Sequence, residues 1–326
     1  MGEFKVEGDT SLKQAYDPDE LFDVANIAND LQTLRDFVRW GVSRLNQEGV
    51  NLGHGYDDPW DEVVSLVLFA LHLPWDVDPR VQDSRLTLLE KKSVVELLRK
   101  RVVDRMPAAY LTGVGWFAGL PFQVDQRALI PRSPIAELIE KQFSPWVEPD
   151  NVESILDLCT GNGCIGMACA FAFPDAMVDC VDLSEDALDL AEKNLQMHQL
   201  DGQVNLLFSD LFEALDGRSY DIIVSNPPYV DAQDMAHLPD EFHYEPRMAL
   251  EAGQDGLDIV RRMLPELSRH LNPGGIVVVE VGNSWEALED TYPDVPFTWL
   301  EFERGGHGIF LLTKEEIDHH QADFVL

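Results

Sequence analysis

Apolar residues recur at three- and four-residue steps through the first third of the chain, a spacing that predicts amphipathic helices. The first helical stretch covers residues 19–45, and a glycine-rich break at 49–55 follows it. A second helix is expected over residues 60–73 and a third over about 81–105. These stretches together predict a helical domain at residues 17–107.

The segments on either side of this domain have different patterns. Residues 1–16 are polar and contain Gly2 and Gly8, so we expect them to be flexible. Residues 108–130 contain two short apolar runs around three glycines, which favours a β-hairpin linker. A proline at the first turn of a short helix then begins a larger domain, residues 131–326.

Beyond residue 151, strand-like and helix-like segments alternate, which predicts an α/β domain with a doubly wound, mostly parallel sheet. The expected strands are 154–159, 176–182, 204–209, 220–225, 275–281, 297–302 and 309–313. The expected helices are 164–173, 185–198, 257–271 and 285–290. The segment between the last two strands is too short for a crossover, so these strands should pair antiparallel at one end of the sheet.

A glycine-rich turn follows the first of these strands. Residues 157–166 read Asp-Leu-Cys-Thr-Gly-Asn-Gly-Cys-Ile-Gly, and the glycines at 161, 163 and 166 fit the G-x-G-x-x-G spacing. Glycine permits a tight turn and the close approach of a ligand, so the motif indicates an adenosine-containing cofactor. A turn that only packs the helix on the strand is the structural alternative.

Acidic residues also end the next two strands. Asp182 lies 21 residues after Gly161, where an acid that binds a ribose is expected. Its alternative role is to cap the following helix, although Ser184 already suits that role. Asp210 and Leu211 follow the third strand, where a carboxylate and an apolar side chain can line an adenine pocket.

The strongest chemical signal is the tetrapeptide Asn226-Pro227-Pro228-Tyr229, which follows the fourth strand. The side-chain oxygen of Asn226 can accept one N–H of a planar NH2 group, and the carbonyl of Pro227 can accept the other. The two prolines stiffen the turn, so both acceptors are preorganised. Tyr229 offers a flat face to the same group. The tetrapeptide therefore favours methylation of an amide or amine over a rigid turn that only closes a strand.

Charge narrows the choice of partner. The 326 residues include 59 acidic and 24 basic ones, which gives a formal net charge of −35. Such a chain repels a phosphate backbone at long range, so a protein that grips bare nucleic acid is disfavoured and a basic partner protein is attracted. Adaptation to salt, or simple solubility, explains the acidity equally well. The apolar content of 45% is ordinary for a protein with a core.

Cysteine usage and the apolar runs bear on the compartment. The cysteines at 159, 164, 169 and 180 lack Cys-x-x-Cys spacing and paired histidines, so neither a zinc site nor a disulfide framework is indicated. We expect reduced, mostly buried thiols in a cytoplasmic protein. No apolar run approaches the ~20 residues of a membrane span, and the N-terminus lacks the apolar run of a signal peptide.

The third predicted helix carries the densest group of basic residues in the chain. We interpret this group as the solvated face of an amphipathic helix, with a contact to RNA or acidic protein as the alternative. Its members are Arg85, Lys91, Lys92, Arg99, Lys100, Arg101 and Arg105.

Over residues 105–312 the chain resembles the methyltransferases that use S-adenosyl-L-methionine to modify glutamine side chains. The resemblance implies a Rossmann-like class I methyltransferase fold: a mostly parallel sheet with a C-terminal antiparallel hairpin, and a small N-terminal helical domain for substrate docking. It rests on Ile130-Pro131-Arg132, residues 157–166, Asp182, Asp210 and residues 226–229, followed by Tyr244-Glu245-Pro246 through Gly256-Leu257.

Residues 131–137 bear on the choice between two branches of this family. The release-factor branch typically reads Pro-Arg-Pro-x-Thr-Glu, whereas this chain reads Pro-Arg-Ser-Pro-Ile-Ala-Glu. That segment, the loop at 157–165 and residues 303–308 resemble the branch that methylates large-ribosomal-subunit protein L-three. The implied partner is a basic ribosomal protein, either free or within an assembling large subunit. Gly166 replaces an alanine of many relatives, a departure expected to matter little.

The resemblance also implies roles for individual residues. The loop at 159–163 would wrap the methionine part of the cofactor, Asp182 would hold the ribose, and Asp210 and Leu211 would border the adenine. The implied cofactor-binding residues are Asp157, Cys159, Thr160, Gly161, Asn162, Gly163, Asp182, Asp210, Leu211 and Asn226. The implied catalytic residues, which would hold or face the substrate amide, are Asn226, Pro227, Pro228 and Tyr229.

Arg132 and Glu245 are expected to shape the substrate mouth, and a surface ion pair of Glu245 with Arg247 is the alternative. An amide nitrogen is a poor nucleophile, so the expected mechanism relies on its alignment with the methyl group. The N-methylated cation is very acidic and needs no strong base. We therefore assign no base to the histidines at 237, 243 and 307, and we expect no metal.

Four other functions compete with this one. A release-factor glutamine methyltransferase shares the chemistry, and an adenine-amine methyltransferase acting on DNA or RNA needs the same acceptor geometry. A ribosome-assembly factor without catalysis would keep the fold alone. A nicotinamide dehydrogenase has no use for the Pro-Pro turn and lacks a proton relay. The net charge counts against the nucleic-acid enzyme, and the intact tetrapeptide counts against the assembly factor.

Overall fold

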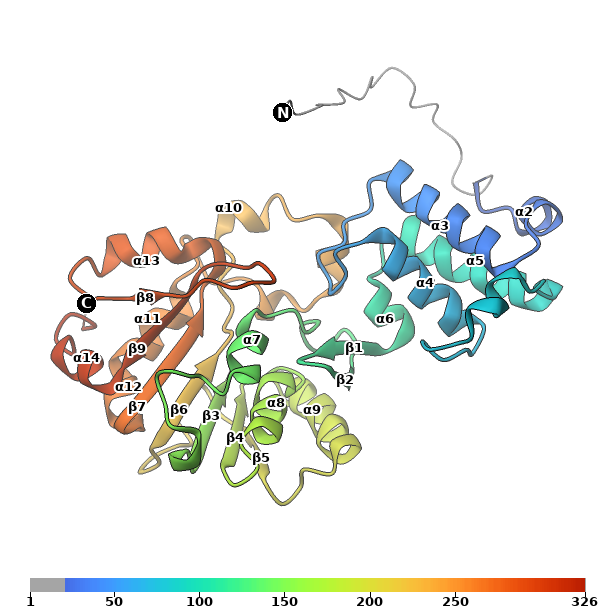
Figure 1. Ribbon diagram of the computed structural model, residues 1–326. Coiled ribbons are helices and arrows are strands. Elements are labelled where there is room, and N and C mark those ends of the chain that lie inside the picture. The colour runs from blue at the N-terminus through green and yellow to red at the C-terminus, as the bar shows by residue number, and fades with distance from the viewer. Residues whose placement is uncertain (1–20, 326) are drawn as a thin grey trace, which may run out of the picture. The chain divides into compact units, whose positions relative to one another are not determined.

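The computed structural model describes residues 21–325, and Figure 1 traces the chain through them. These residues divide into two compact units. One consists of residues 21–50 and 58–106, and the other of residues 51–57 and 107–325. The second unit thus includes a short segment that interrupts the first unit in the sequence.

The first unit is helical. It comprises α2 (Val24–Asp30), α3 (Leu34–Glu48), α4 (Pro59–Ala70), the 3-10 turn η2 (Pro79–Asp83) and α5 (Leu88–Val102). Helices α3, α4 and α5 pack through fully buried apolar side chains. A Cβ on Gly41 would lie 2.7 Å from Val63 Cγ1, so glycine at this position allows α3 to approach α4 closely.

Capping boxes begin α3 and α5 later than the apolar spacing predicts. The Thr33 hydroxyl accepts from the backbone N–H of Asp36, whose carboxylate accepts from the N–H of Thr33. Thr87 and Glu90 form the same pair before α5. Both threonines have extended backbone, which a helix cannot continue through. The continuous helices predicted over 19–45 and 81–105 are therefore wrong at these points.

The basic group of the third predicted helix is a solvated face only in part: Arg85, Lys92 and Lys100 are exposed. Lys91 is buried, and its ammonium donates to the Ala28 carbonyl at 2.8 Å. Arg101 is fully buried, with Nε 2.5 Å from Glu62 Oε1. Arg105 donates to the Glu48 carbonyl at 2.7 Å. The interpretation as a solvated face is wrong for these residues, because helix packing brings acceptors to them from distant segments.

Removing the carboxylate of Glu62 should destabilise this unit strongly. Glu62→Ala leaves the buried guanidinium of Arg101 without that carboxylate, and breaking a buried ion pair typically costs about 3–5 kcal/mol. Urea unfolding measures the loss. The control is Asp83→Ala, which breaks the exposed pair with Arg35 and should cost less than about 1 kcal/mol. Equal losses of unfolding free energy in the two variants would contradict a stabilising role for the buried pair of Glu62 and Arg101.

The second unit is built on a seven-stranded sheet with the order β5-β4-β3-β6-β7-β9-β8. Its strands are β3 (Ser154–Leu158), β4 (Met177–Asp182), β5 (Val204–Phe208), β6 (Tyr220–Ser225), β7 (Leu271–Glu280), β8 (Thr298–Trp299) and β9 (Ile309–Thr313). The first five are parallel, and β9 is antiparallel to both of its neighbours. This confirms the α/β sheet with a C-terminal antiparallel hairpin, although β8 is shorter than predicted.

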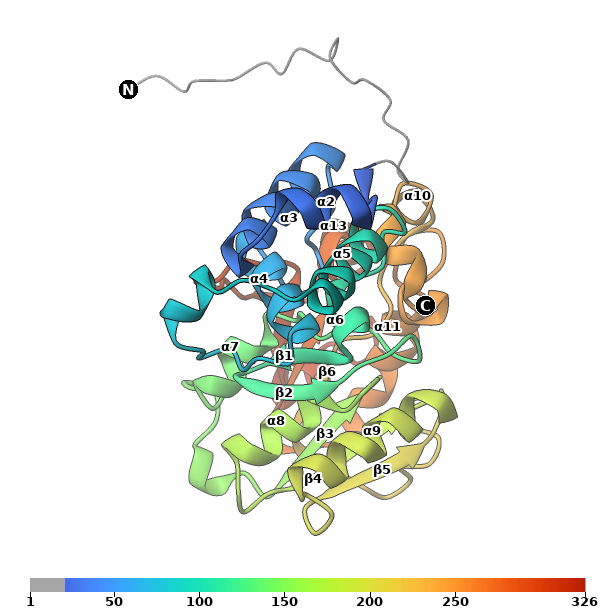
Figure 2. The same cartoon turned by 90° about the vertical axis from the view of Figure 1, so that its right-hand side faces the viewer.

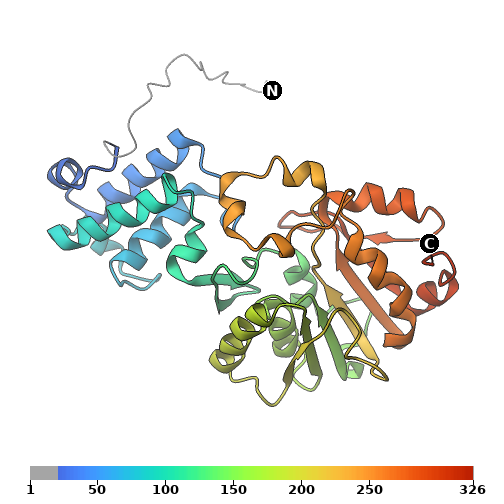
Figure 3. The same cartoon turned by 180° about the vertical axis from the view of Figure 1, so that it is seen from behind.

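Successive strand side chains enter two separate cores, so helices cover both faces of the sheet. One face packs against α7 (Ile135–Glu140), α8 (Cys164–Ala172) and α9 (Glu185–His198). The other packs against α11 (Asp258–Met263), α12 (Leu267–His270), α13 (Trp285–Thr291) and α14 (Lys314–His319). Seen from behind in Figure 3, the orange helical segment that contains α11 crosses the strands.

The helix predicted over 257–271 is interrupted. A 3-10 turn, η6 (Leu264–Glu266), separates α11 from α12. Pro265 lies in this turn, and a proline has no backbone N–H to donate to a preceding carbonyl. The prediction of one continuous helix is wrong here for that reason.

A helical turn and a hairpin precede the sheet. They are α6 (Ala108–Thr112), β1 (Val114–Phe117) and β2 (Leu120–Gln123), and the two strands pair antiparallel. The hairpin agrees with the apolar runs around the glycines, whereas α6 was not predicted. Figure 2 shows the hairpin beside α8 and α9, which it contacts.

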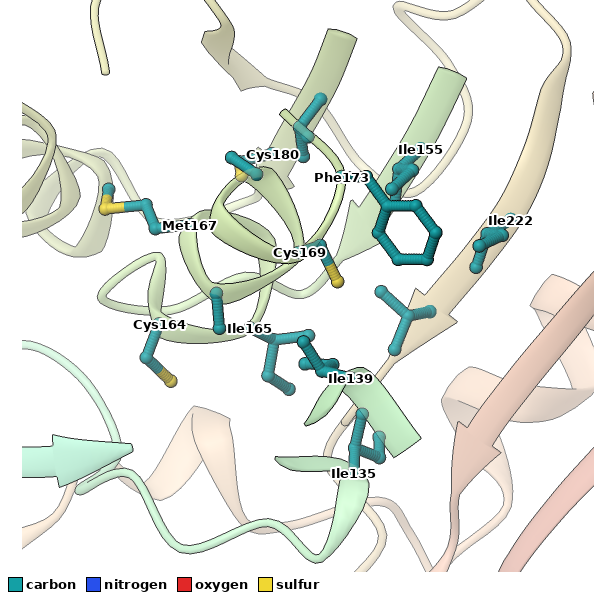
Figure 4. Packing of buried hydrophobic residues seen from close by; sticks show 14 of the residues in the cluster. Ile135, Ile139, Ile155, Cys164, Ile165, Met167, Cys169, Phe173, Cys180 and Ile222 are labelled. Atoms are coloured by element: carbon teal, nitrogen blue, oxygen red, sulfur yellow. The ribbon is translucent and has the colours of Figure 1, made fainter. Parts of the chain in front are cut away.

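Most of the cysteines lie in the core of the second unit. None of the four forms a disulfide, and three are buried. Figure 4 shows Cys169 and Cys180 among the isoleucine and phenylalanine side chains between α8 and the strands. Burial raises the pKa of each thiol. The expectation that the thiols are mostly buried is confirmed.

Residues 21–325 contain neither a candidate membrane span nor a candidate metal cluster. Over residues 21–325, no helix combines the length and the apolar character that a bilayer crossing requires. The same residues contain no cluster of three or more His, Cys, Asp or Glu side chains placed to hold a metal ion. The terminus expected to be flexible, residues 1–16, lies outside the described part.

Candidate active site

The parallel strands β3, β4, β5 and β6 end at one edge of the sheet, and their following loops surround a cavity of about 1070 Å³, measured out to its mouth. Ligands in open α/β sheets bind at this edge. Sequence-predicted site residues that line the cavity are Cys159, Thr160, Gly161, Asn162, Asp182, Asp210, Leu211, Asn226, Pro228 and Arg132. Five other predicted residues do not line it: Asp157, Gly163, Pro227, Tyr229 and Glu245.

Asp157 fixes the conformation of the glycine-rich loop through hydrogen bonds. Its carboxylate is fully buried and accepts from the Thr160 hydroxyl at 2.5 Å and from the N–H of Gly166 at 2.8 Å. Burial raises the pKa of Asp157 to about 7, although these hydrogen bonds oppose the rise. Asp157 thus holds the loop in place and is not itself part of the cavity wall. Gly163, with a φ of 84°, makes the turn into α8.

Gly166 matters more than the sequence suggested. A Cβ at this position would lie 2.2 Å from Cys180 Sγ and 3.1 Å from an Asp157 carboxylate oxygen. An alanine would therefore force the Cys180 side chain, or the backbone of α8 or β4, to shift. The expectation that glycine and alanine are interchangeable here is wrong, because Cys180 fills the space that a smaller neighbour would leave.

Asp182 is held at the cavity by backbone donors from both sides. Its carboxylate accepts from the N–H of Gly161 and from the N–H of Ser184, each at 2.8 Å. The helix cap is Ser184, whose hydroxyl accepts from the N–H of Ala187. Burial raises the pKa of Asp182, and the two backbone hydrogen bonds oppose that shift. Asp182 therefore presents an oriented carboxylate rather than a helix cap.

Asp210 has a partner that the sequence did not predict. Arg262 Nη2 of α11 lies 2.8 Å from Asp210 Oδ2, and both residues line the cavity. Arg262 belongs to no motif and is 52 residues away in the sequence, so no local signal could have found it. The next residue, Leu211, has a φ of 49° and lines the same wall.

The Asn-Pro-Pro-Tyr turn leaves one acceptor buried and unused. Ser225 ends β6, and its hydroxyl donates to the Leu158 carbonyl at 2.8 Å, which fixes the start of the turn. The next side chain, Asn226, lines the cavity. Its Oδ1 is buried and has no hydrogen-bond partner among the described residues. A buried oxygen of this kind is costly unless a donor reaches it, so Asn226 is suited to an incoming N–H group.

Tyr229 is fixed by a buried carboxylate. Its hydroxyl donates to Glu280 Oε1 at 2.9 Å, and Ser133 Oγ donates to Glu280 Oε2 at 2.5 Å. Its ring lies against Gly282, where a Cβ would be 2.5 Å from the ring. Burial raises the pKa of both Glu280 and Tyr229. Sequence reasoning missed Glu280 and Ser133, because Glu280 lies 51 residues from Tyr229 and 147 residues from Ser133 in the chain.

Arg132 and Glu245 form a buried pair. Two guanidinium nitrogens of Arg132 lie 2.6 and 2.8 Å from the two carboxylate oxygens, and Glu245 also accepts from the N–H of Ile130. Burial alone would raise the pKa of Glu245, but Arg132 and His54 lower it to about 2. The alternative pair with Arg247 is wrong, since Arg247 lies on the surface and pairs with Glu251.

The segment at residues 51–57 completes this cluster. His54 is buried, with Nε2 3.5 Å from Glu245 Oε2 and its ring 4.3 Å from that of Phe242. Asn51 donates its N–H to Glu241 in the 3-10 turn η4 (Asp240–Tyr244). No local pattern indicates these contacts, because the glycine-rich segment predicts only a break between helices.

Comparison with known proteins identifies the family. The family model "Methyltransferase small domain" matches residues 145–262. The ribosomal protein uL3 glutamine methyltransferase of Francisella tularensis is 48% identical over 300 residues, which cover 92% of this chain and 96% of that protein. The protein of that name from Xanthomonas campestris is also 48% identical, over 91% of this chain and 96% of its own. The chain belongs to this family of methyltransferases.

Membership of the family confirms the resemblance and the class I methyltransferase fold that the sequence predicts. It also confirms the prediction of an enzyme. Among solved structures, a methyltransferase from Pyrococcus furiosus is similar over 60% of this chain and 89% of its own, with 20% identity and a TM-score of 0.44.

Proposed function

We propose that this methyltransferase transfers a methyl group from S-adenosylmethionine to the side-chain amide nitrogen of a glutamine in ribosomal protein uL3. The observation that carries the proposal is the buried Asn226 Oδ1, an acceptor without a donor in a proline-stiffened turn at the cavity. The shared family with uL3 glutamine methyltransferases supports the substrate.

The cavity fits an adenosine-containing sulfonium compound. The backbone of the loop at 159–163 would surround the methionine part, Asp182 would accept from the ribose hydroxyls, and Leu211 would border the adenine. When bound, the cofactor supplies an electrophilic methyl group. Each arginine that lines the cavity already pairs with a carboxylate: Arg127 with Asp125, Arg132 with Glu245, and Arg262 with Asp210. A cationic ligand therefore meets little repulsion.

The turn at 226–229 would hold the glutamine amide. Asn226 Oδ1 and the Pro227 carbonyl would each accept one N–H, which aims the nitrogen and places partial negative charge where positive charge develops. The ring of Tyr229 would limit rotation of the amide plane. The protonated product loses its proton readily, so no side chain needs to act as a strong base.

The charge of the second unit suits a basic substrate. Its residues include 40 acidic and 11 basic ones, whereas residues 21–50 and 58–106 include 13 and 11. Ten of the eleven bases in the second unit lie in ion pairs with its own carboxylates. The remaining acidic excess would attract a basic ribosomal protein and repel free nucleic acid.

The substrate is either free uL3 or uL3 in an assembling large subunit, and the helical unit would take part in docking. Both named relatives come from bacteria, in which ribosomal proteins are made and assembled in the cytoplasm, and we propose the same location for this reaction.

Methyl transfer from labelled S-adenosylmethionine tests the function directly. Purified uL3 and a release factor are offered in parallel, and label is expected on uL3 alone. The label should disappear when one glutamine of uL3 is replaced by alanine. Label on the release factor alone would contradict the assignment of uL3 as the substrate. Label on neither protein would contradict the proposed function.

The hydrogen bond between Tyr229 and Glu280 should matter for turnover. Tyr229→Phe keeps the flat ring but removes the hydroxyl that fixes it, and we expect about a tenfold loss of kcat, equal to ~1.4 kcal/mol of barrier. The cofactor Kd should stay unchanged. Steady-state kinetics with uL3 and calorimetry with the cofactor measure the two quantities.

Tyr292→Phe is the matched control for this variant. The Tyr292 hydroxyl is buried and has no hydrogen-bond partner among the described residues, and it lies outside the site. Its removal should leave kcat unchanged. Equal turnover of uL3 by the two variants would show that the hydrogen bond between Tyr229 and Glu280 does not contribute to kcat.

A further inference from the structure

A second hollow in the same unit adjoins the cavity. Arg132 lines both, and Tyr229, which lines the second, directly follows Pro228 of the first. Any polypeptide that delivers a glutamine amide to Asn226 has flanking residues that must lie close to this turn. The second hollow is therefore placed to receive them.

One wall of this hollow is a carboxylate held by a chain of hydrogen bonds. Asp234, in α10 (Ala232–Met235), accepts from Asn283 Nδ2 at 2.9 Å. The Asn283 Oδ1 in turn lies 2.9 Å from Nε2 of His307. Asp234 and Asn283 both line the hollow. The side chain of Asp234 is thus oriented by the neutral amide of Asn283.

The loop at 303–308, on which the family resemblance partly rests, anchors the hydrogen bonds between Asp234, Asn283 and His307. The Gly308 carbonyl accepts from the backbone N–H groups of Val281 and Gly282. A Cβ on Gly308 would lie 2.1 Å from the Gly282 carbonyl oxygen, so the loop lies directly on the residues before Asn283. The loop therefore holds Asn283, and through it Asp234, in place.

The charges of the hollow are unbalanced. Its arginine, Arg132, is neutralised by two hydrogen bonds to Glu245. Among residues 21–325, no lysine, arginine or histidine lies within ion-pair distance of Asp234. His237, which also lines the hollow, turns its Nδ1 to the Gln233 carbonyl at 2.7 Å. The hollow therefore offers an uncompensated carboxylate beside the apolar surface of Phe242 and Leu250.

From these contacts we propose that the second hollow binds the segment of uL3 next to the target glutamine, with a lysine or arginine of that segment paired to Asp234. The long apolar stem of such a side chain suits the apolar wall, and its charged end suits the carboxylate. The inference rests on the proposed function and adds to it the residue that selects a basic neighbour of the glutamine.

Asp234→Asn tests the pairing in the full-length enzyme. The amide keeps an oxygen for Asn283 but removes the charge. We expect the KM for uL3 to rise about tenfold at low salt, with kcat within about twofold and the cofactor Kd unchanged. The salt dependence of KM should become shallower, because one charge pair is lost. An unchanged unfolding midpoint would show that the fold is intact.

Asp240→Asn is the matched control, because Asp240 is exposed, lies in the neighbouring turn and does not line the hollow. Its KM should stay at the wild-type value. Equal KM values for the two variants would overturn the inference. Failure of the wild-type enzyme to methylate uL3 would instead overturn the proposed function, so the two failures are distinguishable.

A double-mutant cycle identifies the partner residue. Each lysine or arginine near the methylated glutamine of uL3 is replaced by methionine and assayed with both enzymes. The paired residue should raise KM about tenfold with the wild type but have little further effect with Asp234→Asn. Full additivity for every substitution would contradict the pairing.

Discussion

Asn226→Ala should lower kcat for uL3 methylation by at least about 100-fold, the usual loss when one preorganised polar contact to the transition state is removed. The cofactor Kd should change little, because the loop at 159–163 and Asp182 supply most of the cavity around it. The buried Oδ1 has no other partner among the described residues, so its removal costs the resting protein no hydrogen bond there.

Two further variants separate the acceptor from the shape of the turn. Asn226→Asp keeps an acceptor oxygen at the same place and should retain more activity than the alanine variant. Asn151→Ala changes an exposed asparagine outside the site and should behave as wild type. Single-turnover methylation with excess enzyme measures the chemical step. Wild-type turnover by Asn226→Ala would exclude the proposed role.

Asp182→Ala should weaken cofactor binding by about 10- to 100-fold, since a hydrogen bond to a charged group is worth about 1.5–3 kcal/mol. The variant also removes the acceptor for the N–H groups of Gly161 and Ser184, so the glycine-rich loop loses a support. Titration calorimetry with S-adenosylmethionine measures the change. Unchanged affinity would remove the ribose assignment.

Asp186→Ala is the control for this variant, because Asp186 is an exposed acid in the first turn of α9. It should bind the cofactor as the wild type does. The pH dependence gives a second check. Burial raises the pKa of Asp182, so protonation should weaken cofactor affinity at a higher pH than for an ordinary aspartate. Affinity should therefore fall as the pH falls through that raised pKa.

Local patterns in the sequence determined the sheet, the glycine-rich loop and the Asn-Pro-Pro-Tyr turn. Strand alternation and helical spacing depend on neighbours a few residues apart, and α9 has the bounds that were predicted. The breaks in the N-terminal helices also have a local sequence signal, because Thr87 and Glu90 have the spacing of a capping box. The parallel order of strands then brings their loops to one edge without further information.

Only the tertiary structure decided which charged groups are buried and with whom. Arg132 meets Glu245 across 113 residues, and Ser133 meets Glu280 across 147. The segment of His54, which interrupts the helical unit in sequence, belongs to the unit that contains Glu245. Hydrophobic periodicity depends only on residues that are close in the sequence. The buried pairs form because folding removes water from both charged groups, and each group then needs the other as its hydrogen-bond and charge partner.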